Sequence, residues 1–517
     1  MDEYLEFFSK GELKGKIFNT TGLCVPGKHY MVNIDDKLKS IIKLIQSDAY
    51  FVINRPRQYG KTTTINRLEK ILKTRYKVVS LDFEGVGNIF ESEESFCRYF
   101  INYINSSLHI DVPIIPKFLD LINIIKKITK DTEIILIIDE VDKASNNKLF
   151  LEFLGMLRSL YLSRAKGDST TFKAVILAGV YDIKNLKIKF IDDTESRYNS
   201  PWNIAVKFDI DMSFNEYEIG TMLSDYSNEN MLNFDIEVLS KEIYKFTSGY
   251  PFLVSRICQI IDENILKNKD KAWNEFHIQK AIKILLEENN TLFDDLIKNL
   301  ENNTKLYEYM YNLLILNIAS VFNIDNPEIN LGVMFGYLSK NDNNTIVSNK
   351  IIRERIYNYL VSKTDSKVMS SYNFKDNFIT EDHGLDMEKI LLRFQQFMKE
   401  NYSLRDTEFL ERHGVLLFLS FIKPIINGVG FDYKEVQISE ERRLDIVIQY
   451  NNNKYVIETK IWHGDIAHQK GLKQLENYLD IEGLDNGYLL IFNFNKNKKY
   501  ISERYSIEGK EVFEVIV

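Results

Sequence analysis

The sequence predicts a multidomain α/β protein, with a parallel β-sheet in its N-terminal part and a second α/β region at its C-terminal end. Apolar runs of strand length alternate with helical patterns in the first part, which is typical of a parallel sheet covered on both faces. A second group of short apolar runs follows a long helical stretch. The chain has 517 residues, too many for one hydrophobic core.

The first sheet is expected to contain four strands, at residues 50–54, 76–83, 134–138 and 174–178. Apolar residues at helical spacing predict helices from about 214 to 296. Helices around a short β-rich segment are expected at 300–362, which fits a winged-helix unit. A polar linker at 375–383 is followed by two expected helices, ending at Gly414 and Lys423. The last expected strands lie at 431–438, 443–450, 454–460 and 487–494.

The overall charge limits the kinds of partner. Lys and Arg total 66 against 74 Asp and Glu, which leaves a net charge of −8. This field repels phosphate, so any contact with nucleic acid must use a local basic patch. The 44% hydrophobic and 27% charged residues are typical of a folded protein and exclude wholesale disorder.

Cysteine usage and hydropathy indicate a compartment. Cys24, Cys97 and Cys258 lie far apart, and no pair has metal-ligand spacing, which fits a reducing cytoplasm. The first residues lack the basic-then-apolar pattern of a signal peptide. No apolar run approaches the ~20 residues that span a bilayer. We therefore expect a cytoplasmic protein with no membrane partner.

A phosphate-binding loop is expected between the first strand and the helix that follows it, because Gly60-Lys61-Thr62 stands in that context. Backbone N–H groups around Gly60 would face the phosphates, Lys61 would contact the β- and γ-phosphates, and Thr62 would hold Mg²⁺. The alternative is a surface Gly-Lys-Thr, since Arg55 stands where the standard loop has its first Gly. The candidate nucleotide-binding residues of the loop are Arg57, Gln58, Tyr59, Gly60, Lys61, Thr62 and Thr63.

A second motif supports the first. The apolar strand at 134–138 ends in Asp139-Glu140. Asp139 can hold Mg²⁺ through water, and Glu140 can polarise the attacking water; the alternative for Asp139 is an acidic helix cap. The two motifs occur in the expected order, which predicts ATP and Mg²⁺ as ligands.

Hydrolysis has weaker support than binding. The strand at 174–178 ends at Ala178-Gly179, where many ATPases have a polar sensor residue. Four arginines are candidates for contacting the γ-phosphate, each with a surface or salt-bridge role as its alternative: Arg158, Arg164, Arg197 and Arg256.

Residues 51–64 resemble the predicted AAA-ATPase-like family of bacteria, in which an Arg-Pro-Arg-x-aromatic-Gly-Lys variant replaces the standard loop. Asp139-Glu140-x-Asp142 and the Ser-Gly-Tyr-Pro-Phe run at 248–252 match as well, and the resemblance covers about 15–290. It implies a P-loop core with a helical lid and makes Arg55 a family feature. It also implies that Pro251 lies near the nucleotide and Tyr30, next to His29, near the adenine; a core role is the alternative for Tyr30.

Two acids and a lysine are expected on one face of a C-terminal hairpin. A four-residue turn at 451–454 would place Asp445 opposite Lys460 and one diagonal step from Glu458. The two carboxylates can bind Mg²⁺ or Mn²⁺, with the carbonyl of Thr459 as a further ligand. Lys460 can orient or activate a water for attack on phosphorus. The alternative is a solvated hairpin face with an incidental ion pair.

This arrangement resembles the PD-(D/E)xK nuclease superfamily over about 386–517, with Asp445 as the first acid and Glu458-Thr459-Lys460 as the E-x-K part. The resemblance implies that Gln474, one helical turn before Tyr478, belongs to the site, and that Glu411 supplies a further acid. Leu444 stands where many members have Pro. His463 and His468 are interpreted as surface or secondary contacts.

The expected domains are a P-loop core at 1–215, a helical lid at 216–295, a winged-helix-like region and linker at 296–385, and a restriction-endonuclease-like domain at 386–517.

The expected function is ATP-controlled, metal-dependent cleavage of nucleic acid, DNA more than RNA. A defence or mobile-element role follows by analogy with the family. The alternative is a nucleotide-switched nucleic-acid-binding or scaffold protein with an inactive nuclease fold. A DNA-translocating motor is a weaker alternative, because no full arginine-finger set can be placed. AAA-type ATPases often form rings, so a homo-oligomer stays open.

Overall fold

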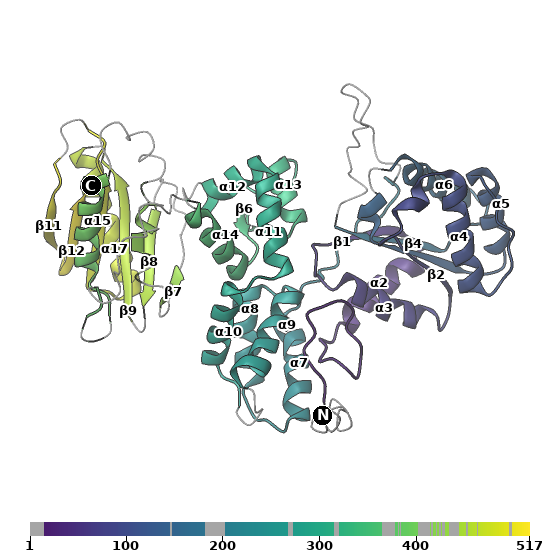
Figure 1. Cartoon of the computed structure of the whole chain (residues 1–517), viewed down its shortest axis with the longest axis horizontal. Helices are drawn as coiled ribbons and strands as arrows, with labels where there is room; N and C mark the ends of the chain where they lie inside the picture. The colour runs from purple at the N-terminus through teal and green to yellow at the C-terminus, as the bar shows by residue number, and fades with distance from the viewer. Residues whose placement is uncertain are drawn as a thin grey trace, which may run out of the picture. The chain divides into compact units, whose positions relative to one another are not determined.

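The computed structural model of the chain divides into two compact units (Figure 1). One comprises Met1–Asp295, Ile324–Ser339 and Val347–Ile352, and the other Leu296–Asn323, Lys340–Ile346 and Arg353–Val517. The region expected to be winged-helix-like therefore contributes to both units, and the three boundaries between the four expected domains stay predictions. The structure describes residues 15–144, 147–180, 202–266, 272–314, 320–363, 378–380, 382, 384–401, 414, 417–419, 421–422, 425, 430–433, 444–450, 453–462, 464–495 and 499–517.

The first unit contains a four-stranded parallel sheet in the order β1-β4-β3-β2. Its strands are β1 (Tyr50–Asn54), β2 (Lys77–Asp82), β3 (Ile134–Asp139) and β4 (Ala174–Gly179). All residues of β3 and β4 are buried, as expected of central strands covered on both faces. The predicted parallel α/β fold is confirmed.

Helices cover both faces of this sheet (Figure 1). One face carries α2 (Asp35–Gln46) and α3 (Lys61–Leu72), and the other carries α4 (Glu93–Leu108), α5 (Phe118–Ile128) and α6 (Lys148–Ala165). Two short 3-10 helices, η1 (Gly87–Phe90) and η2 (Val141–Ala144), follow β2 and β3. The core between the sheet and α4–α6 is rich in fully buried aromatic rings, which contribute large apolar areas. These rings include Phe96, Phe100, Phe150, Phe153 and Phe172.

A helical segment follows, as predicted. It consists of α7 (Glu216–Glu229), α8 (Ile236–Thr247), α9 (Pro251–Ile260), the π-helix η3 (Ile261–Ile265), α10 (Glu275–Glu287) and α11 (Thr291–Asn302). Next come α12 (Thr304–Leu314), α13 (Pro327–Met334), the short strands β5 (Leu338–Asn341) and β6 (Asn344–Val347), and α14 (Lys350–Ser362). Gly249 precedes α9 with φ of +72°, and a Cβ there would lie 1.8 Å from the carbonyl oxygen of Phe214. Only glycine fits this close backbone approach.

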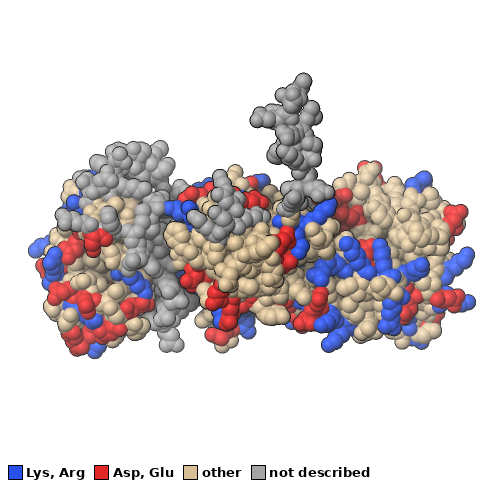
Figure 2. All heavy atoms as spheres, turned by 90° about the horizontal axis from the view of Figure 1, so that it is seen from below, with Lys and Arg blue, Asp and Glu red and all other residues tan. Residues whose placement is uncertain are grey.

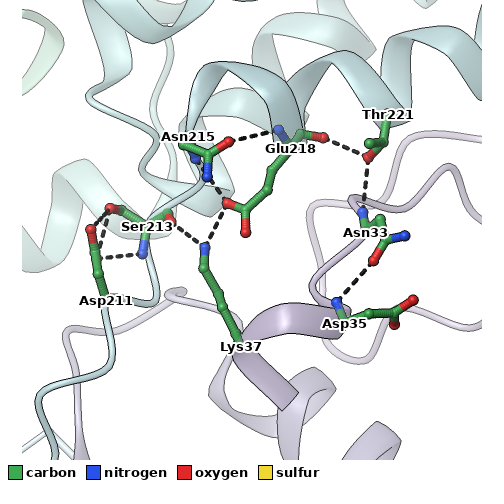
Figure 3. Close-up of polar contacts among 8 residues, drawn as sticks. All are labelled: Asn33, Asp35, Lys37, Asp211, Ser213, Asn215, Glu218 and Thr221. Atoms are coloured by element: carbon green, nitrogen blue, oxygen red, sulfur yellow. Dashed lines mark hydrogen bonds and ion pairs between the residues drawn. The ribbon is translucent and has the colours of Figure 1, made fainter. Parts of the chain in front are cut away.

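An ion pair between Lys37 and Glu218 joins α2 of the parallel-sheet core to α7 of the helical segment (Figure 3). Lys37 of α2 donates from Nζ to the carbonyl of Ser213 at 2.5 Å and to the Glu218 carboxylate at 2.6 Å. Glu218 also accepts from the Asn215 backbone N–H at 2.9 Å, in the capping box that begins α7. Because one carboxylate serves the ion pair and the cap, removing either partner would leave the other charge buried and unpaired.

The second unit contains a six-stranded mixed sheet in the order β11-β12-β10-β9-β8-β7. The strands are β7 (Gly430–Tyr433), β8 (Leu444–Tyr450), β9 (Asn453–Ile461), β10 (Asn486–Phe492), β11 (Ser502–Ile507) and β12 (Lys510–Ile516). Strand β10 runs parallel to β9 and β12, and the other neighbours are antiparallel. Strands β11 and β12 were not expected.

Two helices accompany this sheet, α15 (Met387–Asn401) and α17 (Asp465–Glu482). Leu475 and Leu479 of α17 pack with Leu489, Ile491 and Val512 of the sheet in one hydrophobic cluster. Helix α17 therefore covers the face of the sheet to which Glu458 and Lys460 belong. Within the described residues, no helix is long and apolar enough to cross a membrane. The helices expected to end at Gly414 and Lys423 lie largely outside the described residues.

Candidate nucleotide and nuclease sites

The loop expected to bind phosphate lies between β1 and α3, as predicted from its sequence. Gly60 is the residue before α3 and has φ of +73°, a left-handed conformation that glycine adopts readily. Lys61 begins the helix, is buried, and donates from Nζ to the carbonyls of Arg55 at 3.0 Å and Pro56 at 2.9 Å. Burial lowers the pKa of Lys61, while the charges of Glu140, Asp142 and Asp139 oppose that shift. A phosphate would offer this buried cation a stronger partner than two carbonyls.

Arg55, which stands in place of the usual glycine, stabilises the loop through contacts with its own strand and with a distant segment. Its guanidinium donates to the carbonyls of Asn54 at 2.8 Å and Ile210 at 2.6 Å, and lies 5.1 Å from the ring centre of Phe208. Burial lowers its pKa. Arg55 thus ties the end of β1 to the segment at 208–210.

The rest of the loop contacts the helical segment. Arg57 forms an ion pair with Asp295 at 2.9 Å, and Gln58 donates to the Thr291 hydroxyl at 2.7 Å. The Tyr250 hydroxyl donates to the Arg57 carbonyl at 2.6 Å. Since Asp295 and Thr291 belong to α11 and Tyr250 immediately precedes α9, two helices of this segment hold the loop.

Three further residues complete these contacts. The Tyr59 ring lies edge-on against Tyr250, with the centres 4.7 Å apart, and burial raises the pKa of Tyr59 to about 12. Pro251, buried, begins α9 directly after Tyr250. Thr63 accepts from the Cys24 backbone N–H at 3.2 Å, so the segment before α2 lies over the start of α3.

Asp139 and Thr62 form an oxygen pair beside the loop. The Thr62 hydroxyl donates to Oδ2 of Asp139 at 3.1 Å, and the Glu140 backbone N–H donates to Oδ1 at 2.9 Å. Burial raises the pKa of Asp139. Adjacent hydroxyl and carboxylate oxygens are the ligands that Mg²⁺ prefers, so these two residues fit the metal. Glu140 follows at the carboxyl end of β3, and burial raises its pKa, with the Asp139 charge as the next cause.

Tyr30 lies in an aromatic cluster. Its side chain is 3% exposed, its ring centre is 4.8 Å from Phe18 and 5.2 Å from Tyr226, and its hydroxyl accepts from Asn230 at 3.0 Å. These contacts match the alternative core role, and contact with adenine stays a proposal. The neighbouring His29 accepts the Val25 backbone N–H at Nδ1.

The four candidate arginines differ in position. Arg164 donates to the carbonyls of Phe172 and Asp48, which precede β4 and β1. It therefore lies at the amino ends of the strands, away from the phosphate loop, which matches its alternative structural role. Arg256 is paired with Glu288 at 2.6 Å. Nε of Arg158 is buried without a hydrogen-bond partner among the described residues, and Arg197 lies outside them.

The register of the C-terminal hairpin differs from the prediction. Asp445 pairs with Glu458, and Tyr450 with Asn453, so only two positions separate the last paired residues of the two strands. The predicted four-residue turn was wrong because Asn453 and Lys454 extend the ladder. A shift of two residues preserves the face, so the positions of Asp445, Glu458 and Lys460 still share one side of the sheet.

Glu458 and Lys460 lie beneath α17. Glu458 is 2% exposed, and its Oε1 is 2.8 Å from Nζ of Lys460. Lys460 also donates to Oε1 of Gln474 on α17 at 3.2 Å. A Cβ at Gly471 would lie 3.3 Å from Cε of Lys460, so this glycine lets the helix approach the lysine closely. A buried carboxylate under a helix does not fit a solvated hairpin face.

Some residues expected in the nuclease site lie outside the part of the chain that the structure describes. The Asp445 side chain, Glu411 and His463 lie outside the described residues. Thr459 pairs with Leu444 and Leu490 in the central ladders. The structure thus brings together Glu458, Lys460 and Gln474, with Asp445 in register beside Glu458.

The profile of the AAA-like domain family matches residues 28–354. The chain belongs to the AAA-like domain family. In this AAA-like protein, residues 427–504 also match the profile of the PD-(D/E)XK nuclease superfamily. That match includes β8, β9 and α17, which carry the acids, the lysine and the glutamine.

Solved structures resemble about two thirds of the chain at low identity. The Walker-type ATPase PABY2304 of Pyrococcus abyssi has a TM-score of 0.46 and 12% identity, covering 66% of this chain and 99% of that one. CDC6P of Pyrobaculum aerophilum has a TM-score of 0.33 and 15% identity over 66% and 98% of the chains. The RuvB Holliday junction branch migration motor of Thermotoga maritima has a TM-score of 0.33 and 14% identity, covering 64% of this chain and 95% of that one. No curated protein matches the chain.

The nuclease domain of this AAA-like protein holds a second buried acid that sequence reasoning missed. Glu514 of β12 is 1% exposed, and its carboxylate contacts Nε2 of His468 on α17. Burial raises the Glu514 pKa, and the His468 contact opposes that shift. Leu489 separates this acid from Glu458, since it pairs with both. The available signal was one acid inside the apolar run at 512–517.

Proposed function

We propose that this protein binds and hydrolyses ATP at the P-loop and cleaves nucleic-acid phosphodiester bonds in its nuclease domain, with the nucleotide controlling cleavage. The observation that carries the proposal is the contact of Lys460 with the buried Glu458 carboxylate and with Gln474, next to Asp445 in register. A 2%-exposed carboxylate in an apolar core is costly unless it has a partner or a use.

The nuclease residues have distinct roles. A bound Mg²⁺ or Mn²⁺ would supply a water of lowered pKa and stabilise negative charge on phosphorus. Asp445, Glu458 and the carbonyl of Thr459 would hold the ion. Lys460, with its ammonium held by Gln474, orients the attacking water and offers positive charge to the phosphate oxygens. Water oxygen then bonds to phosphorus as the bond to the leaving sugar oxygen breaks.

The residues of the ATP site also have distinct roles. Lys61 binds the β- and γ-phosphates, and Thr62 and Asp139 would hold Mg²⁺. Glu140 takes a proton from the water that attacks the γ-phosphorus, and ADP and phosphate leave. Because α11 and Tyr250 contact the loop through Arg57 and Gln58, phosphate binding changes contacts outside the P-loop core.

A local basic patch supports nucleic acid as the partner. Residues 35–77 carry eleven Lys or Arg and four Asp or Glu, although the whole chain has a net charge of −8. Figure 2 shows Lys and Arg gathered on this side of the first unit. The exposed cations outside the loop are Lys39, Lys43, Lys70, Lys73, Arg75 and Lys77. We propose DNA rather than RNA as the substrate. We also propose that the protein acts in a bacterial cytoplasm, in defence or in mobile-element biology, as a monomer or a homo-oligomer.

A second candidate is a nucleotide-switched binding or scaffold protein with an inactive nuclease fold. Two observations favour it. Strand β4 ends in Ala178-Gly179 without a polar side chain, and Lys460 is held in an ion pair with Glu458. In this case the sheet and α17 bind nucleic acid without cutting it.

Cleavage of a panel of single- and double-stranded DNA and RNA by the full chain separates the two candidates. Mg²⁺- or Mn²⁺-dependent products that EDTA abolishes support the nuclease. Lys460→Ala should lower the rate at least ~100-fold, as loss of a charged catalytic group does. Lys454→Ala is the matched control, because Lys454 lies on the same strand and pairs with Glu482. Wild-type cleavage by Lys460→Ala would refute the site.

ATP binding is measured separately. Lys61→Ala should lose ATP binding, whereas Lys70→Ala, an exposed lysine on the same helix, should keep it. Unchanged binding by Lys61→Ala would refute the P-loop assignment.

A further inference from the structure

Strand β4 ends without a polar side chain next to the loop that carries the hydrolytic acid. Strands β3 and β4 are neighbours, with Ile138 paired to Leu177. Strand β3 continues into Asp139 and Glu140, while β4 ends in Ala178 and Gly179. If ATP is hydrolysed here, a polar group at this edge of the sheet has to come from another residue.

Asp142 fills the space beside Gly179. A Cβ at Gly179 would lie 2.7 Å from Oδ1 of Asp142 and 2.9 Å from Cγ2 of Val141. Gly179 does not have a positive φ, so its backbone would accept a side chain. The neighbouring residues therefore exclude that side chain, and the Asp142 carboxylate takes its place.

Asp142 also binds the exit of β4. Its Oδ2 accepts the Val180 backbone N–H at 2.5 Å. A hydrogen bond to a carboxylate is stronger than one between neutral groups. This contact fastens η2, which begins directly after Glu140, to the end of β4.

Glu140 needs such support because its backbone is strained. Its φ is +52°, in the left-handed region that side chains rarely adopt. Strain of this kind persists only where the surrounding structure holds the residue in place. On one side, the Glu140 N–H donates to Asp139; on the other, Val141 is fully buried and Asp142 is fastened to Val180.

We infer that Asp142 is a positioning residue for ATP hydrolysis: by binding the exit of β4 it holds Glu140 in its strained conformation and replaces the polar side chain absent from Gly179. The inference rests on the proposed ATPase function. Asp142 then affects the rate of the hydrolytic step, whereas Lys61 binds the phosphates.

Steady-state ATP hydrolysis and equilibrium ATP binding test the inference. Asp142→Ala should lower kcat about 100-fold, the size of effect expected when a general base is misplaced. Its KM and ATP Kd should stay within about twofold of wild type, since uniform binding is unchanged. Asp142→Asn keeps an oxygen acceptor for Val180, so it should retain kcat within about fivefold.

A second variant reaches the same contact from β4. Gly179→Ala places a methyl group where the Asp142 carboxylate lies, so it should lower kcat as Asp142→Ala does. The double variant should lose little more than either single one, because both remove one interaction. Gly155→Ala on α6 is the matched control, because a Cβ there meets nothing within 4 Å.

Three results would overturn the inference: wild-type kcat in Asp142→Ala, Asp142→Asn as inactive as Asp142→Ala, or loss of ATP binding in Asp142→Ala while its thermal unfolding matches wild type. A wild-type protein that hydrolyses no more ATP than Glu140→Gln would instead contradict ATP hydrolysis itself.

Discussion

Asp445 lies directly opposite Glu458 in the β8–β9 ladder. Directly opposed residues of an antiparallel pair share a face, and their Cβ atoms lie about 5 Å apart. Two acids in this arrangement can serve one cation, and Lys460 follows two residues after Glu458 on the same face. The ladder therefore places the whole predicted acid-and-lysine set on the face that α17 covers.

Asp445→Asn should abolish both Mn²⁺ binding by the nuclease domain and cleavage, since a neutral amide holds a divalent ion less well than a carboxylate. Calorimetric Mn²⁺ titration and cleavage rates measure the two effects. Asp485→Asn, an exposed acid of the same unit that pairs with Lys510, should behave as wild type. Tight Mn²⁺ binding by Asp445→Asn would show that the acid is not a ligand.

Arg55→Gly should destabilise the ATPase core, although it restores the standard loop sequence. The variant loses charge-assisted hydrogen bonds to two carbonyls and a contact with the Phe208 ring. A loss of about 2–3 kcal/mol in the free energy of unfolding is expected, as for hydrogen bonds to charged groups. Thermal unfolding of Arg55→Gly beside Arg75→Gly, an exposed control, measures it. A gain in stability and ATP affinity would contradict the structural role of Arg55.

The basic patch at 35–77 should contribute to nucleic-acid binding. Lys43→Glu with Lys70→Glu reverses two exposed charges on α2 and α3 and should weaken DNA binding. It should also reduce the slope of log K against log salt by about 1–2, since each phosphate contact contributes about one unit. Lys241→Glu, an exposed lysine of α8 that pairs with Glu237, is the control. An unchanged slope would place the nucleic acid elsewhere.

Glu514→Gln should change how stability depends on pH. Burial raises the pKa of Glu514 in the folded protein. As pH rises through the usual glutamate range into that raised range, the unfolded chain ionises first, so the wild type loses stability that the variant keeps. Hydrogen exchange of β12 and α17, corrected for intrinsic rates, should show wild type losing protection relative to Glu514→Gln. A constant difference across pH would indicate that Glu514 has no raised pKa.

The parallel sheet, the phosphate loop and the nuclease hairpin were predictable because each depends on local signals. Continuous apolar runs marked the buried strands, and Gly60-Lys61-Thr62 stood between a strand and a helix. The acids and lysine were recognisable because strand alternation assigns residues to faces without knowledge of the partner strand.

The failures concerned the backbone register of the hairpin and contacts between residues far apart in the sequence. The hairpin register was wrong by two residues because polar Asn453 and Lys454 form ladder pairs through their backbones, whatever their side chains. Arg55 binds the carbonyl of Ile210, which is 155 positions away. His468 meets Glu514 on a strand that was not predicted.

We propose that ATP at the P-loop controls cleavage in the nuclease domain. The most direct measurement compares cleavage rates with and without ATP, in saturating Mg²⁺, for wild type and Lys61→Ala. We predict that ATP changes the wild-type rate and leaves the Lys61→Ala rate unchanged, while both proteins lose cleavage when Lys460 is replaced by Ala. Metal-dependent cleavage that ATP changes equally in wild type and Lys61→Ala, or in neither, would contradict control through this site.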